Sequence, residues 1–128
     1  LDIIRAGLVR SAHDCAEGGL AVALAECCIS RTDPGPMIGA TIDLGPVTGR
    51  LDAVLFGESQ SRVVVSAAPD RVDRIRDKAA AAGVPLLPLG VTGGDQLKID
   101  TSAGPLAWDL AALHDPWWHT IGRLMQAR

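Results

Sequence analysis

The sequence has no excess of basic residues, no long apolar run and no export signal. Its 12 lysines and arginines are outnumbered by 15 aspartates and glutamates, giving a net charge of −3. Without a basic patch there is no electrostatic footprint for nucleic acid. No apolar stretch reaches the ~20 residues of a bilayer-spanning helix, and no basic segment followed by an apolar one opens the chain. We therefore expect no nucleic-acid partner, no membrane and a cytoplasmic location.

Cysteines are few, and their spacing excludes two kinds of site. The chain has three, an odd number with Cys27 and Cys28 adjacent, which does not make a disulfide framework. A zinc site of His13, Cys15, Cys27 and Cys28 fails because adjacent helical residues point about 100° apart and no Cys-x-x-Cys occurs. A Cys–His nucleophile pair lacks an orienting third group. The cysteines are interpreted as small buried apolar residues, and no metal ligand or catalytic residue is assigned in this chain.

The remaining composition is that of a globular domain. The 128 residues are 48% hydrophobic and 21% charged, so residues 1–128 are expected to form a single domain. Because the sequence opens on Leu1, we expect this domain to be a fragment of a longer chain.

Periodicity and turn residues predict alternating helices and strands. Helices are expected over residues 2–9, 20–29, 49–58, 69–83 and 108–125, the last interrupted near Pro116. Strands are expected over 11–15, 37–44 and 61–68, and as a hairpin within 85–100 that turns at 93–95; residues 31–36 form a breaker. This order predicts an α+β domain in which helices pack on a mixed, largely antiparallel sheet with a partly ferredoxin-like core.

The first candidate site lies where residues 11–15 lead into the apolar helix. His13 and Asp14 precede Gly18 and Gly19, and free N–H groups at such a strand-to-helix turn can hold an anion. The alternative is a tight turn in which His13 is hydrogen-bonded and Asp14 caps the turn. These four residues alone leave both interpretations open.

The second candidate site is the polar run between residues 56 and 62. It consists of five consecutive polar residues between two apolar segments: Glu58, Ser59, Gln60, Ser61 and Arg62. A turn needs about two polar residues, so the run favours hydrogen bonding to a polar ligand; a solvated loop is the alternative.

The aromatic residues gather near the end of the chain, at Trp117 and Trp118 beside His119. Tryptophan is enriched at interface hot spots, so this segment is a candidate interface anchor. The alternative is that its rings dock on the protein's own sheet.

Three segments occur in an order and at separations that resemble a known family: SAHDCAEGGLAVALAE at 11–26, LFGESQSRVVVS at 55–66 and LGVTGGDQLKID at 89–100. Together they are similar to the carboxy-terminal domain of phosphoribosylformylglycinamidine synthases, within the aminoimidazole ribonucleotide synthetase-like superfamily. The resemblance covers nearly the whole chain. Those enzymes carry two carboxy-terminal-type domains, and the features of residues 13–26 and the end of the chain identify this one as the second copy.

The resemblance implies part of an ATP-dependent ligase of purine biosynthesis. The whole enzyme would convert formylglycinamide ribonucleotide, glutamine and ATP to formylglycinamidine ribonucleotide, ADP, phosphate and glutamate. Family ligands for ATP and Mg²⁺ belong to amino-terminal-type domains outside this segment. In the first copy the Glu-Ser-Gln loop is implied to contact the substrate; Glu58, Ser59 and Gln60 are the matching positions here.

The implied partners are amino-terminal domains of the same chain, a glutaminase subunit and a small accessory subunit. Two alternatives remain. One is another superfamily member, such as an aminoimidazole ribonucleotide or selenophosphate synthetase. The other is a stand-alone ferredoxin-like module for ligand binding or dimerisation.

Overall fold

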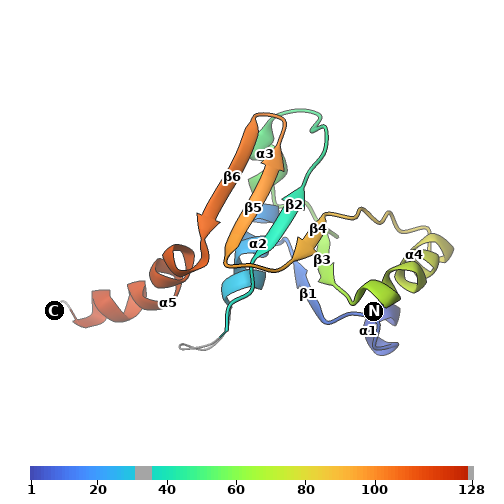
Figure 1. The fold of residues 1–128 in the computed structure, drawn as a ribbon, viewed down its shortest axis with the longest axis horizontal. Coiled ribbons are helices and arrows are strands. Elements are labelled where there is room, and N and C mark those ends of the chain that lie inside the picture. Colours follow the sequence, from blue (N-terminus) through green and yellow to red (C-terminus); the bar gives the residue numbers. More distant parts are fainter. Residues whose placement is uncertain (31–35, 127–128) are drawn as a thin grey trace.

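The computed structural model describes residues 1–30 and 36–126, and it arranges them as helices around two separate sheets (Figure 1). The predicted breaker at 31–36 lies almost wholly outside the described residues. The helices are α1 (Asp2–Arg5), α2 (Gly19–Ile29), α3 (Leu51–Phe56), the 3-10 turn η1 (Pro69–Arg71), α4 (Val72–Ala81) and α5 (Leu110–Gln126). The strands are β1 (Ser11–Asp14), β2 (Ala40–Asp43), β3 (Val63–Ser66), β4 (Gly90–Thr92), β5 (Gln96–Thr101) and β6 (Gly104–Asp109).

The two sheets differ in size and in pairing. Strands β1 and β3 form an antiparallel pair, while the larger sheet has the order β4-β2-β5-β6. In the larger sheet β2 pairs antiparallel with β4 and parallel with β5, and β5 pairs antiparallel with β6. The predicted α+β class with a mixed, largely antiparallel sheet is therefore confirmed.

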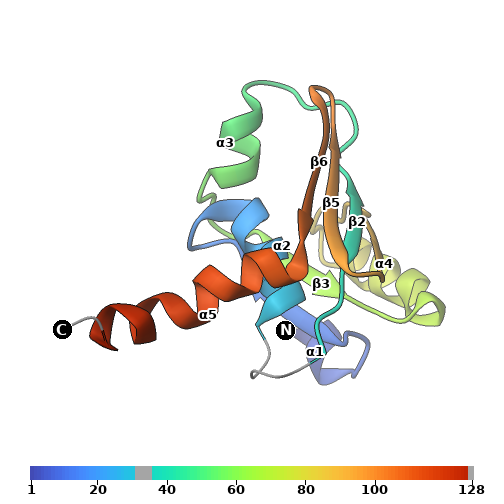
Figure 2. The same cartoon turned by 60° about the vertical axis from the view of Figure 1, so that its left-hand side comes forward.

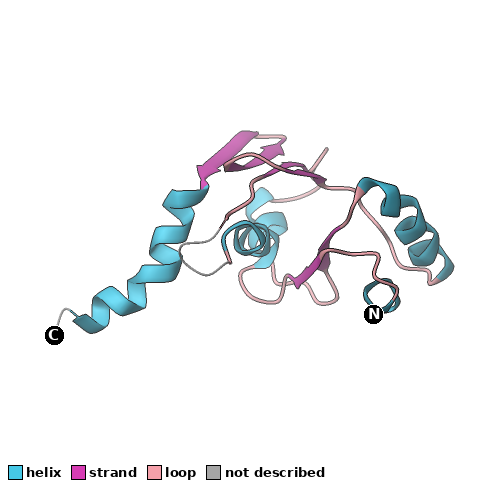
Figure 3. Cartoon of the chain, turned by 60° about the horizontal axis from the view of Figure 1, so that its bottom comes forward, coloured by secondary structure: helices cyan, strands magenta, loops and turns pink. Residues whose placement is uncertain are grey.

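Helix α2 is the centre of the core, as its apolar sequence predicts. It contacts α3, α5, β1, β3 and β5, and Figure 3 shows it beneath the larger sheet. Its buried residues Ala23 and Leu24 belong to one cluster with Leu97 and Ile99 of β5. Removing a leucine or isoleucine side chain of this cluster from water stabilises the fold by about 1.5–3 kcal/mol.

The predicted hairpin within residues 85–100 is wrong, because its two strands do not pair with each other. Strand β2 lies between them, so that Thr41 faces Val91 on one side and Lys98 on the other. The reason is a backbone clamp: the Gly93 amide donates to the Gly39 carbonyl at 2.7 Å, and the Gly39 amide donates to the Gly94 carbonyl at 2.9 Å. The turn that was expected to close a hairpin instead passes around the start of β2.

The carboxy-terminal prediction needs two corrections. Residues 104–109 form strand β6, so Trp108 lies in a strand rather than at the start of a helix. Helix α5 then runs through Pro116 without interruption. Asp115 binds Arg123 through both carboxylate oxygens, at 2.7 and 2.6 Å, and these contacts hold the turns after the proline to the turn before it.

The helix predicted over 69–83 is confirmed as η1 followed by α4. Gly83 has φ +64° and its amide donates to Ala80, while the amide of Val84 donates to Ala79. These are the bonds of a Schellman motif, which ends a helix at a left-handed glycine. Within α4, Ile75 is the one buried residue. No helix among the described residues has the length and apolarity needed to cross a membrane.

Candidate functional site

The structure brings one residue of the first candidate site, Asp14, into a polar cavity with the whole of the second, whereas His13, Gly18 and Gly19 do not line it. A space of about 430 Å³ opens between the turn after β1 and the loop before β3. Its lining consists of Asp14, Ala16, Glu58, Ser59, Gln60, Ser61, Arg62 and Val63. The antiparallel pairing of β1 with β3 is what places the two segments side by side, because Asp14 is opposite Val63.

The backbone amide at the glycine turn already has a hydrogen-bond acceptor, the side-chain carboxylate of Glu58. The Gly18 amide donates to Glu58 Oε1 at 3.0 Å, a bond that a bound anion would otherwise accept. Asp14 Oδ1 accepts from the Ala16 amide at 3.3 Å and so caps its own turn. This arrangement supports the architectural interpretation of residues 13–19 over the anion site.

Gly19 is required by the way α2 meets α3, and Gly18 by its left-handed backbone and the nearby Val22 side chain. Gly18 and Gly19 have φ of +75° and +76°. A Cβ added to Gly19 would lie 2.6 Å from the Phe56 backbone carbon, and one added to Gly18 would lie 2.6 Å from Val22 Cγ2. Real Cβ atoms do not approach that closely, so the end of α3 packs on the start of α2 only if no side chain intervenes.

The loop that faces the cavity carries unused hydrogen-bonding groups. Within the described residues, the side chains of Ser59, Gln60 and Ser61 make no hydrogen bond, and all three are exposed. Ser61 has φ +65°, the one positive value found at a described residue other than glycine. Left-handed backbone at such a residue is strained and clusters at functional sites.

Arg62 is the cationic group of the cavity, and only part of its guanidinium group is hydrogen-bonded within the described residues. Its Nη2 donates to the Gly57 carbonyl at 2.6 Å. Its Nε is buried and has no hydrogen-bond partner among the described residues. Because Asp14 and Glu58 also line the cavity, its carboxylates outnumber this one guanidinium.

The cysteines are poor nucleophiles in this environment. Burial raises the pKa of the Cys15 thiol, and the nearby charge of Arg62 offsets only part of that rise. Burial also raises the pKa of Cys27, and that of Cys28 to about 11. Thiolates, the reactive form, are therefore disfavoured at all three positions. Among residues 1–30 and 36–126, no group of at least three His, Cys, Asp or Glu residues is arranged to hold a metal ion.

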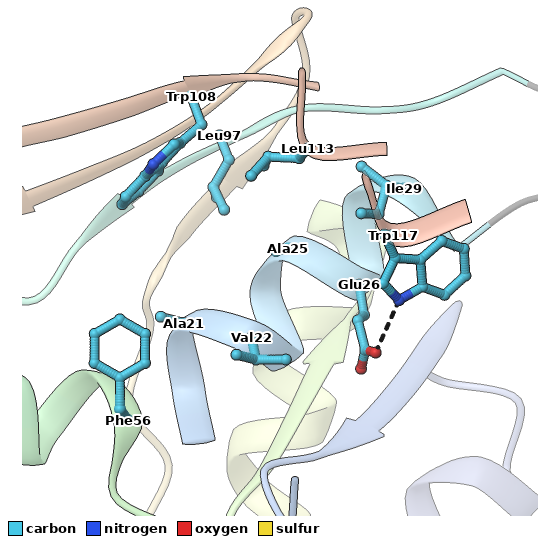
Figure 4. Close-up of a pocket in the computed structure, with 10 residues that line it drawn as sticks. All are labelled: Ala21, Val22, Ala25, Glu26, Ile29, Phe56, Leu97, Trp108, Leu113 and Trp117. Atoms are coloured by element: carbon cyan, nitrogen blue, oxygen red, sulfur yellow. Dashed lines mark hydrogen bonds between the residues drawn. The ribbon is translucent and has the colours of Figure 1, made fainter. Parts of the chain in front are cut away.

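A second, apolar cavity of about 310 Å³ lies along α2 (Figure 4). We call it the α2–α5 groove, and it is lined by Ala21, Val22, Ala25, Glu26, Ile29, Phe56, Leu97, Trp108, Leu113 and Trp117. Trp117 Nε1 donates to Glu26 Oε1 at 3.2 Å. Glu26 belongs to none of the predicted candidate sites; its one signal in the sequence is that it is the only acidic residue in the apolar run 20–29.

Of the two interpretations of the aromatic segment, docking on the protein's own sheet does not hold for Trp118 and His119. Both lie on α5, and Figure 2 shows this helix extending away from the sheets. Trp117 and Trp118 are 42% and 43% exposed, and the ring of His114 stacks on that of Trp118 at 5.8 Å. Only Trp117 reaches the core side, at the rim of the groove.

Comparison with known proteins identifies the relatives of this chain. Residues 1–100 match the family described as AIR synthase related protein, C-terminal domain. The chain is 44% identical over 119 residues to phosphoribosylformylglycinamidine synthase subunit PurL of an Anaeromyxobacter species, covering 89% of this chain and 15% of that protein. It is 40% identical over 119 residues to the same subunit of Sinorhizobium fredii, covering 93% of this chain and 15% of that protein.

Solved structures agree in fold. T. maritima PurL complexed with ATP superposes with a TM-score of 0.73 at 21% identity, covering 89% of this chain and 20% of that one. T. maritima PurL complexed with FGAR gives a TM-score of 0.72 at 20% identity, covering 88% and 19%. The resemblance inferred from the three motifs is thus confirmed. The chain spans about 15% of the length of the curated relatives it matches.

Proposed function

Because this chain belongs to the family of carboxy-terminal domains of AIR synthase-related proteins, we propose that it is such a domain of a phosphoribosylformylglycinamidine synthase. The observation that carries the proposal is its 44% identity to a PurL subunit over 119 residues. The other superfamily enzymes share the architecture, but the GESQSR run at 57–62 favours the formylglycinamidine synthases among them.

The proposed reaction belongs to the whole enzyme, an ATP-dependent carbon–nitrogen ligase of purine biosynthesis. ATP activates the amide oxygen of formylglycinamide ribonucleotide, and ammonia from glutamine then displaces phosphate to give formylglycinamidine ribonucleotide, ADP, phosphate and glutamate. In this proposal the chain supplies the scaffold behind the reacting groups, as the second of two carboxy-terminal-type domains. The enzyme would act in the cytoplasm with a glutaminase subunit and a small accessory subunit.

The described residues of this chain do not fit ATP and Mg²⁺. A nucleotide triphosphate needs several amides or cations directed at its phosphates, whereas the polar cavity offers Arg62 against Asp14 and Glu58. The Gly18 amide is already hydrogen-bonded to Glu58. The described residues also hold no cluster of three metal-ligating groups. We therefore assign ATP and Mg²⁺ to amino-terminal-type domains of the longer enzyme.

A smaller contribution to ligand binding is compatible with the loop 58–62. Ser59 and Ser61 offer hydroxyls, Gln60 offers an amide, and the Arg62 Nε is a donor with no partner in the part of the chain that the structure describes. Such groups suit the phosphate or ribose of a ribonucleotide. Glu58 is better suited to fixing the glycine turn, as its bond to Gly18 indicates.

A chimera tests this proposal. Residues 1–128 replace the matching segment of the Anaeromyxobacter PurL subunit, and formylglycinamidine ribonucleotide formation is assayed with ATP and ammonia. We expect turnover within about tenfold of the parent enzyme, a barrier difference of about 1.4 kcal/mol; the parent lacking this segment serves as the control. A folded chimera as inactive as that truncated control would contradict the assignment.

The same chimera carrying Ser59→Ala and Gln60→Ala tests the loop. A loss of turnover above roughly 100-fold, about 2.7 kcal/mol, at unchanged thermal stability would identify a working ligand site. Lower thermal stability with turnover nearly intact would indicate that the loop has a structural role only.

A further inference from the structure

An apolar stripe runs along the whole of helix α5. Its members recur three or four residues apart, the spacing that places side chains on one face of a helix. They are Leu110, Leu113, Trp117, Ile121 and Leu124, with Trp118 and Met125 along one edge. A face of this kind normally packs on another apolar surface, so α5 is patterned to be covered from end to end.

The core of this chain covers only the first half of the stripe. Leu113 packs against the core cluster, and Trp117 is the last residue of α5 that lines the α2–α5 groove. Further along the helix, Ile121, Leu124 and Met125 are 73%, 67% and 75% exposed. Figure 2 shows the reason, because α5 continues away from α2 and from both sheets. We call the second half the distal stripe: Trp117, Trp118, Ile121, Leu124 and Met125.

The charged side chains of the same turns are paired with one another. Asp115 binds Arg123 through both carboxylate oxygens, and its Oδ1 lies 3.2 Å from Nδ1 of His119. These three residues are spaced four apart, on the side of α5 that faces away from the distal stripe. No charged residue interrupts the stripe in the described part of α5. A surface that fits it is therefore apolar and needs no complementary charge.

The distal stripe is too small to hold a separate protein by itself. A stable interface between two chains buries about 800 Å² on each partner, from roughly 20–30 residues, whereas the stripe offers five side chains. Pairing of α5 with a second copy as a coiled coil would need at least about three heptads. A contact within one polypeptide needs less area, because linked segments meet at an effective concentration of about millimolar.

The composition of α5 also argues against a lipid surface. Helices that lie on membranes carry many lysines and arginines on their polar face. The described part of α5 has one, Arg123, and this guanidinium is already bound to Asp115.

Most of each relative lies outside the segment that this chain matches. The match covers 15% of the PurL subunits of Anaeromyxobacter and Sinorhizobium fredii, and 20% of the T. maritima structure. Under the proposed function, further domains of the same polypeptide are therefore available to cover the distal stripe.

We propose that the distal stripe is an interdomain docking surface, packed on an uncharged apolar surface of another domain of the same synthase polypeptide. This proposal rests on the proposed function, which supplies those further domains. The docked domain lies beside the α2–α5 groove and continues the surface on which the first half of α5 packs. Trp117 contacts both surfaces, and Trp117 and Trp118 are the expected anchors, because tryptophan is enriched at interface hot spots.

Hydroxyl-radical footprinting read by mass spectrometry tests whether the stripe is covered. The oxidation rates of Trp118 and Met125 are compared between the 128-residue protein and the folded PurL chimera. We expect both rates to fall about fivefold in the chimera, while the rate of His119, on the other side of the helix, stays unchanged. Equal rates for Trp118 and Met125 in the two proteins would overturn the proposal, whether or not the chimera is active.

The same measurement separates this proposal from its premise and from other occupants. An inactive chimera in which Trp118 and Met125 are protected would contradict the proposed reaction and support the docking surface. Protection that appears in the 128-residue protein itself and increases with its concentration would assign the stripe to a second copy and overturn the proposal. Protection of that protein by added phosphatidylglycerol vesicles, with none in the chimera, would assign the stripe to lipid and overturn it too.

A double variant tests what the docking contributes to stability. Ile121→Gln with Leu124→Gln should leave the melting temperature of the 128-residue protein within about 2 °C, because both side chains are mostly exposed there. In the chimera the same pair should lower the melting temperature by about 5 °C or more. The matched control Gln126→Ala lies on the other side of the same turn and should change neither protein. A double variant that affects the chimera no more than Gln126→Ala would overturn the proposal.

Discussion

At the scale of single residues, the absence of a side chain at Gly19 decides where α2 sits. The backbone there has φ +76°, and the Phe56 backbone occupies the space that a Cβ would take. Gly18 donates its amide to Glu58, which ties the same turn to the loop before β3. A short sequence feature, two consecutive glycines, thus holds three segments of the chain in contact.

Gly19→Ala is expected to destabilise the fold strongly. The left-handed backbone costs an alanine about 1–2 kcal/mol, and displacing the Phe56 backbone adds about 1–3 kcal/mol of overpacking. Gly83→Ala is the matched control, because Gly83 has φ +64° with open space around it. Urea unfolding should show a loss of about 1–2 kcal/mol for the control and about twice that for Gly19→Ala, because only Gly19→Ala adds the overpacking cost; equal losses would refute the packing argument.

At the scale of elements, α5 depends on the residue that ends the strand before it. Asp109 Oδ1 accepts from the amides of Ala111 and Ala112 at 2.9 and 3.3 Å, so the last residue of β6 caps the helix. Beyond Pro116 the helix is held by the contacts of Asp115 with Arg123 and His119. Strand and helix therefore meet without a linking loop, which is why the boundary between them was hard to see in the sequence.

Asp109→Ala should shorten or loosen α5. Loss of an N-cap side chain typically costs about 1 kcal/mol, and circular dichroism together with thermal unfolding measures both helix content and stability. Asp109→Asn keeps a capping oxygen and should cost less than half as much. A variant with asparagine that is as unstable as the alanine variant would show that the cap is not the reason.

At the scale of the whole molecule, the hydrophobic core encloses cysteine thiols that form no disulfide. Cys15 and Cys28 are buried in the cluster that α2 forms with β2, β5 and α5. Burial, with a smaller contribution from Cys27, raises the pKa of Cys28 from 9.0 to about 11. The folded state thus retains a proton that the unfolded chain releases in this range.

This retained proton makes stability depend on alkaline pH. The folded state binds more protons than the unfolded state between pH 9.0 and about 11, so stability is full below that interval and falls as the pH rises through it. The Cys28 contribution is on the order of 2 kcal/mol. Chemical unfolding at pH 8 and at about pH 11 should show a steeper fall for the natural sequence than for Cys28→Ala; parallel curves would exclude Cys28 as the source.

Much of the fold could be predicted because its signals are local. The apolar run 20–29, the β-branched run at 63–65 and the glycine stop at Gly83 each indicate one element, and each element was found. The polar residues 58–62 and the glycine turn were also recognised as separate candidates. What each candidate contacts was not predictable, because Glu58 and Gly18 are 40 residues apart in the chain.

The sequence by itself determined the types and order of most elements, with β6 as the exception, and the family to which the chain belongs. Those properties follow from periodicity, turn residues and motif spacing, all of which act over short distances along the chain. Only the tertiary structure decided that β2 separates β4 from β5, that Glu58 fills the glycine turn and that Glu26 joins His13 to Trp117. Each of these is a pairing between distant segments, and distant pairings depend on how the whole core closes rather than on any one stretch of residues.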